Sequence, residues 1–408
     1  MTISAQSDSA SQIPAASVVP TSASAHVLVV DDLEINRDLL ARRVKRLGHT
    51  FAFAASGKEA LDCLRTDSFD LVLLDITMPE MDGYEALAQI KVDPKLAHIP
   101  VVMVTAIDGV DSIVRCLELG AEDYITKPFD PVILRARIES SLNKKRLADL
   151  NVKLLNSLSR EMLIAQRIQL GFLPESLPQL AGWPIAASCV PAKHVGGDFF
   201  DAMVLPGGQL ALTVADVCDK GVGAALYMAL FRSLLRISLQ QAEQNQSSEQ
   251  ILEKAASFTN DYIATVHARD NMFATVFIAI LCPQTGRLDY INAGHDAPML
   301  LRHNSATIES LPPEGLAIGM MAGARYQAQH IQINTGDSLF MFSDGLPEAL
   351  NSQNMAFGEE RVLSTFRTCA HSPEALLKTL SADLAQHIGE RPPHDDVTML
   401  SLFAEPRI

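Results

Sequence analysis

The feature that most constrains the fold is an alternation, between residues 25 and 141, of short apolar runs with segments of helical spacing. The runs are "HVLVV", "LVLL", "VVMV" and "DYIT", and between them apolar residues recur at steps of three and four. Continuous apolar strands separated by helices predict a parallel sheet that is covered on both faces. We therefore predict a doubly wound α/β domain over residues 25–141.

Polar residues follow each of these runs. The first run ends in Asp31 and Asp32, and the later ones end in Asp75, Thr105 and Lys127. Functional groups in such sheets gather outside the carboxyl ends of the strands. Three carboxylates there can hold a hard divalent cation, which would draw a phosphoryl group onto Asp75 as nucleophile. Lys127 would neutralise the phosphoryl oxygens and Thr105 would donate to one of them, although a single acid at such a place is usually a helix cap.

Four segments, "VVDD", "LLDITMPEMDG", "VVMVTA" and "DYITKPF", resemble the receiver domain of two-component response regulators over nearly the whole of this domain. The resemblance implies a flavodoxin-like fold and phosphorylation of Asp75 by a histidine kinase or a phosphotransfer protein. It also implies a Mg²⁺ ion held by Asp31, Asp32 and Asp75. A cis peptide bond before Pro128 and an influence of Thr77 on phosphate lifetime are further implications. The switch residues that it implies are Thr105, Tyr124 and Lys127.

The segment that follows has no glycine or proline from Val132 to Leu170. One continuous helix of this length would reach about 60 Å. Steps of three and four, with a run of +4 steps that interrupts a strict heptad, connect Leu147, Leu150, Leu154, Leu158, Met162, Ala165 and Gln169. The pattern fits a parallel dimeric coiled coil, which we favour, or an amphipathic helix folded onto its own chain. We assign residues 142–173 to this helical linker, which Gly171 ends.

The second half, residues 174–406, is richer in alternating strands. "MFATVFIAIL", the turn "CPQTG" and "RLDYINAG" predict a hairpin, while "GVGAALYMALFRSLLRISLQ" and "SPEALLKTLSADLAQHI" have helical spacing. Strands and helices that occur in separate blocks predict packed antiparallel sheets with helices outside.

The acids of this half lie at predicted strand ends or beside glycine: Asp198 in "VGGDFFD", Asp216 in "VADVCDKG", Asp344 in "FSDG" and Asp395 in "HDDVT". Four carboxylates without a His or Cys partner favour hard Mg²⁺ or Mn²⁺ over zinc. Glycine lets the backbone come close, so a carbonyl such as that of Val217 can join as a ligand. Two ions bridged by one carboxylate would orient an activated water for attack on a phosphate ester.

The stretch "VGGDFFD" has two other interpretations. Two glycines before an acid are most often a turn that enters a strand. A nucleotide-cyclase hairpin would need a glutamate after Asp198, where Phe199 stands, and acids on an upstream strand. The upstream stretch "WPIAASCVPAKH" has none, so we reject the cyclase hypothesis.

These segments, with "AQRIQLGFLPESLP", "INAGHDAP" and "FSDGLPEALN", resemble the bacterial stress-response and sporulation branch of the metal-dependent type 2C protein phosphatases over about residues 160–406. The resemblance implies an α-β-β-α sandwich, two Mn²⁺ or Mg²⁺ ions, and a phosphoserine or phosphothreonine substrate on an anti-sigma-factor antagonist. The metal ligands that it implies are Asp198, Asp216 as the bridge, the Val217 carbonyl, Asp344 and Asp395.

Three further acids, Asp201, Asp219 and Asp396, are expected beside these ligands, where they would orient them. The sequence departs from the family at Cys218-Asp219, where Ser-Gly is commoner, and at Pro347, where Thr is commoner. Neither change removes a ligand, so we predict an active enzyme.

Three histidines lie in or beside the motifs: His194, His295 and His394. A leaving serine oxygen needs a proton, so each is conceivable as a general acid. Histidines in such turns are more often structural, which is the interpretation we favour.

The composition limits the location and the partners. A formal net charge of −15 argues against nucleic acid or an anionic membrane as the main partner. We find no apolar run near the roughly 18 residues of a membrane span and no secretory signal. Six scattered cysteines indicate reduced residues in the cytoplasm. Residues 1–24 are rich in Ser, Ala and Pro, and we predict that they are disordered.

Together these features predict a cytoplasmic, dimeric response regulator whose output is a serine/threonine phosphatase controlled by phosphorylation of Asp75. In this partner-switching hypothesis the linker helix carries the state of the receiver. The alternative is a non-catalytic adaptor, controlled in the same way, that only binds a sigma-factor regulator. A DNA-binding regulator is disfavoured, because the chain has neither a basic patch nor a helix-turn-helix segment.

Overall fold

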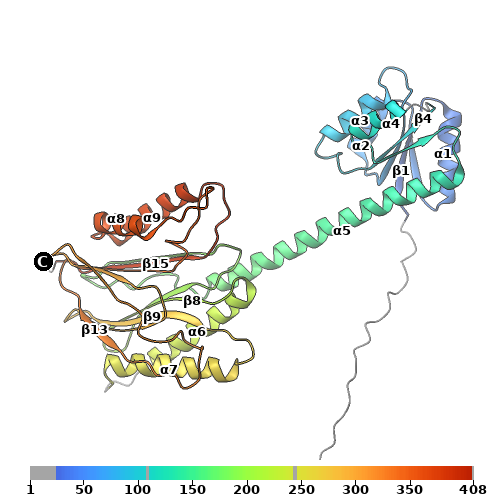
Figure 1. The fold of residues 1–408 in the computed structure, drawn as a ribbon. Coiled ribbons are helices and arrows are strands. Elements are labelled where there is room, and N and C mark those ends of the chain that lie inside the picture. The colour runs from blue at the N-terminus through green and yellow to red at the C-terminus, as the bar shows by residue number, and fades with distance from the viewer. Residues whose placement is uncertain (1–23, 107–109, 242–245, 407–408) are drawn as a thin grey trace, which may run out of the picture. The chain divides into compact units, whose positions relative to one another are not determined.

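The computed structural model describes residues 24–106, 110–241 and 246–406, so nearly all of the predicted tail at 1–24 lies outside the described residues. Two units are distinguished by their internal contacts, Met1–Ser157 and Leu158–Ile408. Each is considered by itself below (Figure 1).

The first unit contains a five-stranded parallel sheet in the order β2-β1-β3-β4-β5. This is the flavodoxin-like strand order, and it confirms the predicted doubly wound domain. Every residue of β3 and β4 is buried, as continuous apolar strands require. Helices α2, α3 and α4 cover one face, and α1 and the start of α5 cover the other. The elements are β1 (His26–Val30), α1 (Glu34–Arg46), β2 (Thr50–Ala54), α2 (Gly57–Thr66), β3 (Leu71–Asp75), α3 (Gly83–Val92), β4 (Val101–Thr105), α4 (Val110–Glu118) and β5 (Asp123–Thr126).

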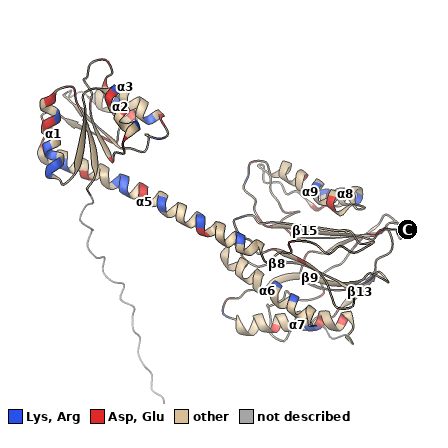
Figure 2. Ribbon diagram, turned by 180° about the vertical axis from the view of Figure 1, so that it is seen from behind, with Lys and Arg blue, Asp and Glu red and all other residues tan. Residues whose placement is uncertain are grey.

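Helix α5, Pro131–Leu170, has 40 residues. The carboxylate of Asp130 accepts hydrogen bonds from the backbone of Val132 and Ile133 and so caps its first turn. Leu134, Ile138 and Leu142 are buried against the first sheet, whereas the apolar side chains that follow are exposed. Figure 2 shows basic and acidic positions, in blue and red, interspersed along the ribbon of this helix.

The second unit is a sandwich of two five-stranded antiparallel sheets, ordered β13-β10-β9-β8-β7 and β12-β11-β14-β15-β6. Helices α6 and α7 pack on the first sheet and α8 and α9 on the second, with a third apolar core between the sheets (Figure 1). The predicted α-β-β-α sandwich and its β9–β10 hairpin are thus confirmed. The strands are β6 (Ile185–Val190), β7 (Phe199–Val204), β8 (Leu210–Val217), β9 (Ala274–Cys282), β10 (Arg287–Ala293), β11 (Met299–Leu301), β12 (Ile308–Ser310), β13 (Gln329–Gln332), β14 (Ser338–Phe342) and β15 (Val397–Phe403). The helices are α6 (Val222–Gln240), α7 (Ser248–Val266), α8 (Glu359–Cys369) and α9 (Pro373–Ile388).

One element corrects the sequence analysis. Among the described helices, α6 is long and apolar enough to cross a membrane by length and composition, with a mean hydropathy of 1.4. Its apolar composition has another explanation, because Met228, Phe231 and Leu235 pack in the sandwich core. Its Arg232 and Arg236 form ion pairs with Asp201 of β7. The core helix of a sandwich passes the same test of length and composition.

The core around β14 supports the strand that leads into Asp344. Phe340 is fully buried, with its ring 5.3 Å from that of Phe342 and 5.4 Å from that of Phe366. We expect Phe340→Ala to lower the free energy of unfolding of the second unit by about 3–5 kcal/mol, because it leaves a cavity. Phe258→Ala is the control, since Phe258 is 53% exposed. Denaturant unfolding followed by Trp183 fluorescence would measure both, and equal losses would contradict this core.

Candidate functional site

The predicted acids of the first unit meet at the carboxyl ends of β1 and β3. Carboxylate oxygens of Asp31, Asp32 and Asp75 all lie within 4.8 Å of one another. Lys127 Nζ lies 2.8 Å from Asp31 Oδ2 and 3.0 Å from Asp75 Oδ1. The donor set is oxygen only and partly buried, which fits a hard cation such as Mg²⁺.

The charges of this cluster depend on one another. Burial raises the pKa of Asp75, and the hydrogen bond from Lys127 opposes that rise. Burial alone would lower the pKa of Lys127, but its hydrogen bonds to Asp31 and Asp75 raise the pKa. Both pKa values are therefore raised, which favours a charged Lys127 but a neutral Asp75. The 3.0 Å contact with an ammonium that keeps its proton nevertheless favours an ionised Asp75.

Two of the predicted switch residues, Thr105 and Tyr124, lie on the strands β4 and β5. Thr105 is buried at the end of β4. Tyr124, in β5, is half-buried, and the guanidinium of Arg137 from α5 lies 5.8 Å from its ring centroid. Arg137 also donates to Asp123 at 2.6 Å. The peptide bond between Lys127 and Pro128 is cis, as the resemblance to receivers implies. The sequence analysis did not identify the contact between Arg137 and Tyr124.

The predicted ligands of the second unit lie at one end of the sandwich. Asp198 precedes β7 and Asp395 precedes β15, while Asp216 is near the end of β8 and Asp344 follows β14. In antiparallel pairs the end of β8 lies beside the start of β7, and the end of β14 beside the start of β15. Asp198 is buried and the other three are half-buried.

Burial and neighbouring acids raise the pKa values of three of these carboxyls. Burial and the charge of Asp216 raise the pKa of Asp198 well above its ordinary value. Burial and Asp344 raise the pKa of Asp216 to about 7. Burial and Asp395 likewise raise the pKa of Asp344. Carboxylates that repel one another at a desolvated site are stabilised by a divalent cation, and the donors here are oxygens.

The four carboxylates are nevertheless spread out. Among the described residues, no three of them have oxygens that all lie within 4.8 Å of one another, unlike the acids of the first unit. Within the described residues these four acids therefore do not form one compact cluster like that of the first unit.

Asp396 holds the backbone of the ligand-bearing loop. Its Oδ1 accepts from Ala192 N at 2.7 Å, and its Oδ2 accepts from Gly197 N at 2.7 Å and from Asp198 N at 3.4 Å. A Cβ at Gly196 would lie 2.2 Å from Asp396 Oδ2, and one at Gly197 would lie 2.6 Å from the Val217 carbonyl oxygen. Because the two glycines of "VGGDFFD" have no Cβ, the Asp396 carboxylate can approach Gly196 and the Val217 carbonyl can approach Gly197.

Two contacts were missed by the sequence analysis. Ser343 Oγ donates to Asp198 Oδ2 at 2.6 Å and accepts from Thr398 N at 3.0 Å. Lys220 Nζ lies 2.6 Å from Asp395 Oδ2 and donates to the His394 carbonyl at 2.9 Å. Both residues belong to the quoted motifs "FSDG" and "VADVCDKG", in which only acids were predicted as site residues.

The other two acids that we expected beside the ligands have different surroundings. Asp201 is buried, and its carboxylate accepts from Arg232 at 3.1 Å and from Arg236 at 2.6 Å, so it anchors α6 to β7. Asp219 is exposed with a φ of 73°, a conformation that favours glycine. Its carboxylate accepts from Lys220 N. A glycine, which the resemblance to the phosphatases implies at this position, would adopt this φ without strain.

The histidines of the motifs differ in exposure. His295 is buried, with Nδ1 3.0 Å from Thr275 Oγ1, and burial lowers its pKa to about 4. A neutral imidazole cannot act as a general acid at neutral pH. His194 and His394 are exposed.

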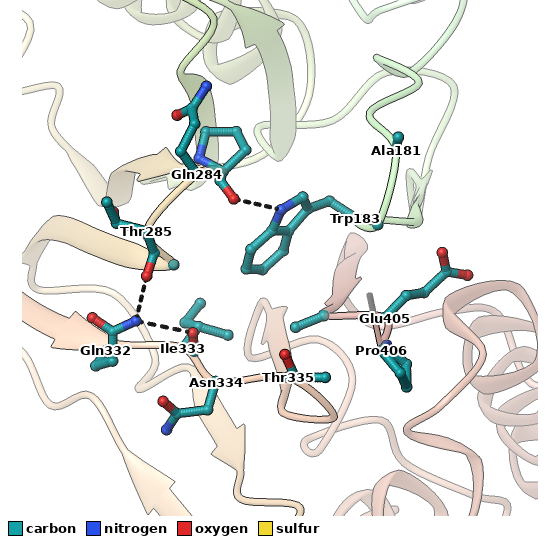
Figure 3. A pocket seen from close by; sticks show the side chains of 14 residues that line it. Ala181, Trp183, Gln284, Thr285, Gln332, Ile333, Asn334, Thr335, Glu405 and Pro406 are labelled. Carbon is teal, nitrogen blue, oxygen red and sulfur yellow. Dashed lines mark hydrogen bonds between the residues drawn. The ribbon is translucent and has the colours of Figure 1, made fainter. Parts of the chain in front are cut away.

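A cavity of about 850 Å³ lies at the opposite end of the sandwich. It is bordered by Trp183, whose indole N–H donates to the Pro283 carbonyl at 3.3 Å, and by Gln332 and Asn334 (Figure 3). Glu405 is its one acidic lining residue, so it offers no donor set for a cation.

Two family models match the sequence: the response regulator receiver domain over residues 27–139, and stage II sporulation protein E (SpoIIE) over residues 206–404. The second match includes Asp216, Asp344 and Asp395 and begins after Asp198.

Curated relatives match parts of the chain. Protein IcfG of Synechocystis sp. (strain ATCC 27184 / PCC 6803 / Kazusa) is 34% identical over 262 residues, 60% of this chain and 41% of that protein. Response regulator PleD of Caulobacter vibrioides is 42% identical over 126 residues, 31% of this chain and 28% of that protein. The chain thus spans less than half of the length of both relatives.

Solved structures match the second unit. The SiaA-PP2C domain of Pseudomonas aeruginosa has a TM-score of 0.52 at 20% identity, over 61% of this chain and 98% of that one, which shows a shared fold. The RsbU and RsbW domains of Rv1364c from Mycobacterium tuberculosis have a TM-score of 0.47 at 26% identity, over 58% of this chain and 64% of that one.

The raised pKa of Asp216 predicts a pH-dependent stability. A carboxyl that holds its proton more tightly when folded stabilises the fold below about pH 4, and this stability is lost as the pH rises through about 7. In the presence of a chelator we therefore expect Asp216→Asn to exceed the wild type in free energy of unfolding. The difference should grow between pH 4 and pH 7 to on the order of 2 kcal/mol.

Thermal or denaturant unfolding across this pH range would measure the difference. Asp383→Asn, at an exposed carboxylate of α9, is the matched control and should follow the wild type. Added Mn²⁺ should reverse the order of Asp216→Asn and wild type, because only the wild type keeps the ligand. A difference that shrinks with rising pH would contradict the repulsion.

Proposed function

We propose that this chain, which joins a response regulator receiver domain to a SpoIIE/PP2C-type phosphatase domain, is a metal-dependent protein serine/threonine phosphatase controlled by phosphorylation of Asp75. The observation that carries the proposal is the group of repelling carboxylates at one end of the sandwich. Its counterpart in the receiver is the cluster around Asp75 and Lys127.

In the phosphatase domain, the proposed ligands of two Mn²⁺ or Mg²⁺ ions are Asp198, Asp216, the Val217 carbonyl, Asp344 and Asp395. When bound, two such ions would lower the pKa of a water and orient it for attack on a phosphate ester. The protein's part is to hold the ligands in place. Asp396 fixes the loop backbone, and Ser343 fixes the Asp198 carboxylate by a 2.6 Å hydrogen bond.

In the receiver domain, Asp31, Asp32 and Asp75 are the proposed Mg²⁺ ligands, and a histidine kinase or phosphotransfer protein is the proposed phosphate donor. A phosphoryl group on Asp75 would bring negative charge next to Lys127 and Thr105. Tyr124 lies beneath Arg137 of α5, so a change in its position would reach that helix.

The proposed substrate is a phosphoserine or phosphothreonine on an anti-sigma-factor antagonist in the cytoplasm. This part rests on the resemblance of "VADVCDKG", "INAGHDAP" and "FSDGLPEALN" to the stress-response and sporulation phosphatases. An antagonist dephosphorylated by this chain would bind its anti-sigma factor, which is the logic of partner switching.

We also propose that α5 forms a parallel dimer. Leu147, Leu150, Leu154 and Leu158 follow steps of three and four, and each is at least 45% exposed. A row of exposed leucines along one helix is costly in water and is buried by pairing with a second copy.

The activity is tested by Mn²⁺-dependent hydrolysis of an aryl phosphate. We expect Asp344→Asn to lower kcat/KM by about 100-fold or more, because a direct metal ligand is lost. A beryllofluoride mimic of the phosphoryl group should change the wild-type rate, with either sign, and Asp75→Asn should abolish that change. Asp383→Asn controls for the loss of an acid and should match the wild type.

A rate insensitive to beryllofluoride would refute the control by Asp75. If neither the aryl phosphate nor a phosphorylated antagonist were hydrolysed under any condition, while the antagonist still bound, the non-catalytic adaptor would be the better explanation.

The dimer is tested by the double variant Leu150→Glu and Leu154→Glu. We expect sedimentation equilibrium to show a monomer, because two carboxylates per chain would lie in the helix–helix seam. Asn156→Glu is the control, since Asn156 is exposed about 180° around the helix from Leu147. A wild-type monomer, or an equal loss of dimer in the control, would contradict the proposed seam.

A further inference from the structure

The last turn of α5 is hydrogen-bonded to the loop that carries Asp198. Gln169 Nε2 donates to the Gly196 carbonyl oxygen at 2.5 Å, and Gly196 N donates to Gln169 Oε1 at 3.1 Å. One side-chain amide therefore satisfies both backbone groups of a single residue. Gln169 and Gly196 both belong to the second unit.

Gly196 is held on its other side by Asp396. The carboxylate that occupies the space of a Cβ at Gly196 also accepts from the backbone of Gly197 and Asp198. Thus Gln169 from α5 and Asp396 from the start of β15 hold adjacent residues of one loop. That loop leads directly into Asp198, the most buried of the four proposed ligands.

Apolar side chains at and after the end of α5 lie near this loop. Leu170 and Leu173 line a small space together with Cys189, Asp198 and Met228 of α6. The helix ends at Leu170, and Gly171 N donates to the carbonyls of Arg167 and Ile168. The side chain of Gln169 therefore moves with the last turn of α5.

The chemistry of the contact requires an amide. A primary amide offers a donor and an acceptor in one plane, which is what a backbone N–H and C=O of one residue demand. A carboxylate at this position could accept from Gly196 N but could not donate to its carbonyl. An apolar side chain could do neither.

We infer that Gln169 is a positioning residue, which fixes the Gly196–Asp198 loop to the end of α5 and so sets how tightly the site at Asp198 holds a divalent cation. This inference deepens the proposed function and rests on it only for the link to hydrolysis. The hydrogen bonds to Gly196 stand independently of any activity.

The experiment uses the full-length chain and two measurements. Hydrogen–deuterium exchange of a peptide covering residues 192–198 reports the loop without metal or activity. The Mn²⁺ dependence of aryl phosphate hydrolysis reports the ligand site. Gln169→Ala removes both hydrogen bonds, Gln169→Glu keeps one acceptor, and Gln166→Ala is the matched control, because Gln166 has no side-chain hydrogen bond within the described residues.

We expect faster exchange of residues 192–198 in Gln169→Ala, and a Mn²⁺ concentration for half-maximal activity raised about tenfold, which corresponds to about 1.4 kcal/mol. The rate at saturating Mn²⁺ should stay within about twofold of wild type, because excess metal restores the site. Gln169→Glu should be intermediate and Gln166→Ala unchanged. If Gln169→Ala failed to fold, as judged by circular dichroism, Gln169→Glu would carry the comparison.

Unchanged exchange would overturn the inference. Faster exchange with an unchanged Mn²⁺ requirement would overturn its link to the metal site, and a lower rate that excess Mn²⁺ did not restore would do the same. An inactive wild type with faster exchange in Gln169→Ala would instead refute the proposed function and support the role of Gln169 in holding the loop.

Discussion

The arrangement at the end of the sandwich depends on the buried carboxylate of Asp396. Two backbone N–H groups at 2.7 Å, from Ala192 and Gly197, compensate for the burial of its charge. The carboxylate thereby ties the start of β15 to the loop between β6 and β7, across two sheets. The close approach excludes a Cβ at Gly196, so the sequence requirement and the hydrogen bonds have one cause. The neighbouring acids repel one another, but Asp198 stays in place because Asp396 fixes the backbone that carries it.

The acids of the second unit differ in whether hydrogen-bond donors or cationic side chains compensate their charge. Asp201 is paired with two arginines, and Asp396 accepts from backbone amides. Asp198, Asp216 and Asp344 have raised pKa values because burial and neighbouring acids dominate their surroundings. Folding alone does not remove that cost, so the uncompensated set marks where a cation would contribute most. In the receiver Lys127 lies between Asp31 and Asp75, whereas in the second unit Lys220 pairs with Asp395.

Features set by local sequence patterns could be predicted, whereas contacts between residues far apart in the sequence could not. The parallel sheet and the clustering of Asp31, Asp75 and Lys127 follow from local patterns, because strand ends of a parallel sheet meet at one edge. The environment of Asp201 does not. Its partners lie 31 and 35 residues away, on a segment for which the sequence predicted only helical spacing. Nor did spacing show that Gln169, part of a row of steps of three and four, turns toward Gly196.

Helix α5 contains a residue that contacts the receiver's Tyr124 and another that contacts the loop leading to Asp198. Arg137 lies against Tyr124 near its start, and Gln169 holds Gly196 at its end. The two positions lie in the same helix, near its first and last residues. A helix passes a shift or rotation from one position to the other only if it does not bend or fray between them. Its middle turns expose leucines and have few tertiary contacts to stiffen them. Pairing of two copies would bury those leucines and supply that stiffness, so the proposed dimer and the proposed control of the Asp198 loop require the same property of α5.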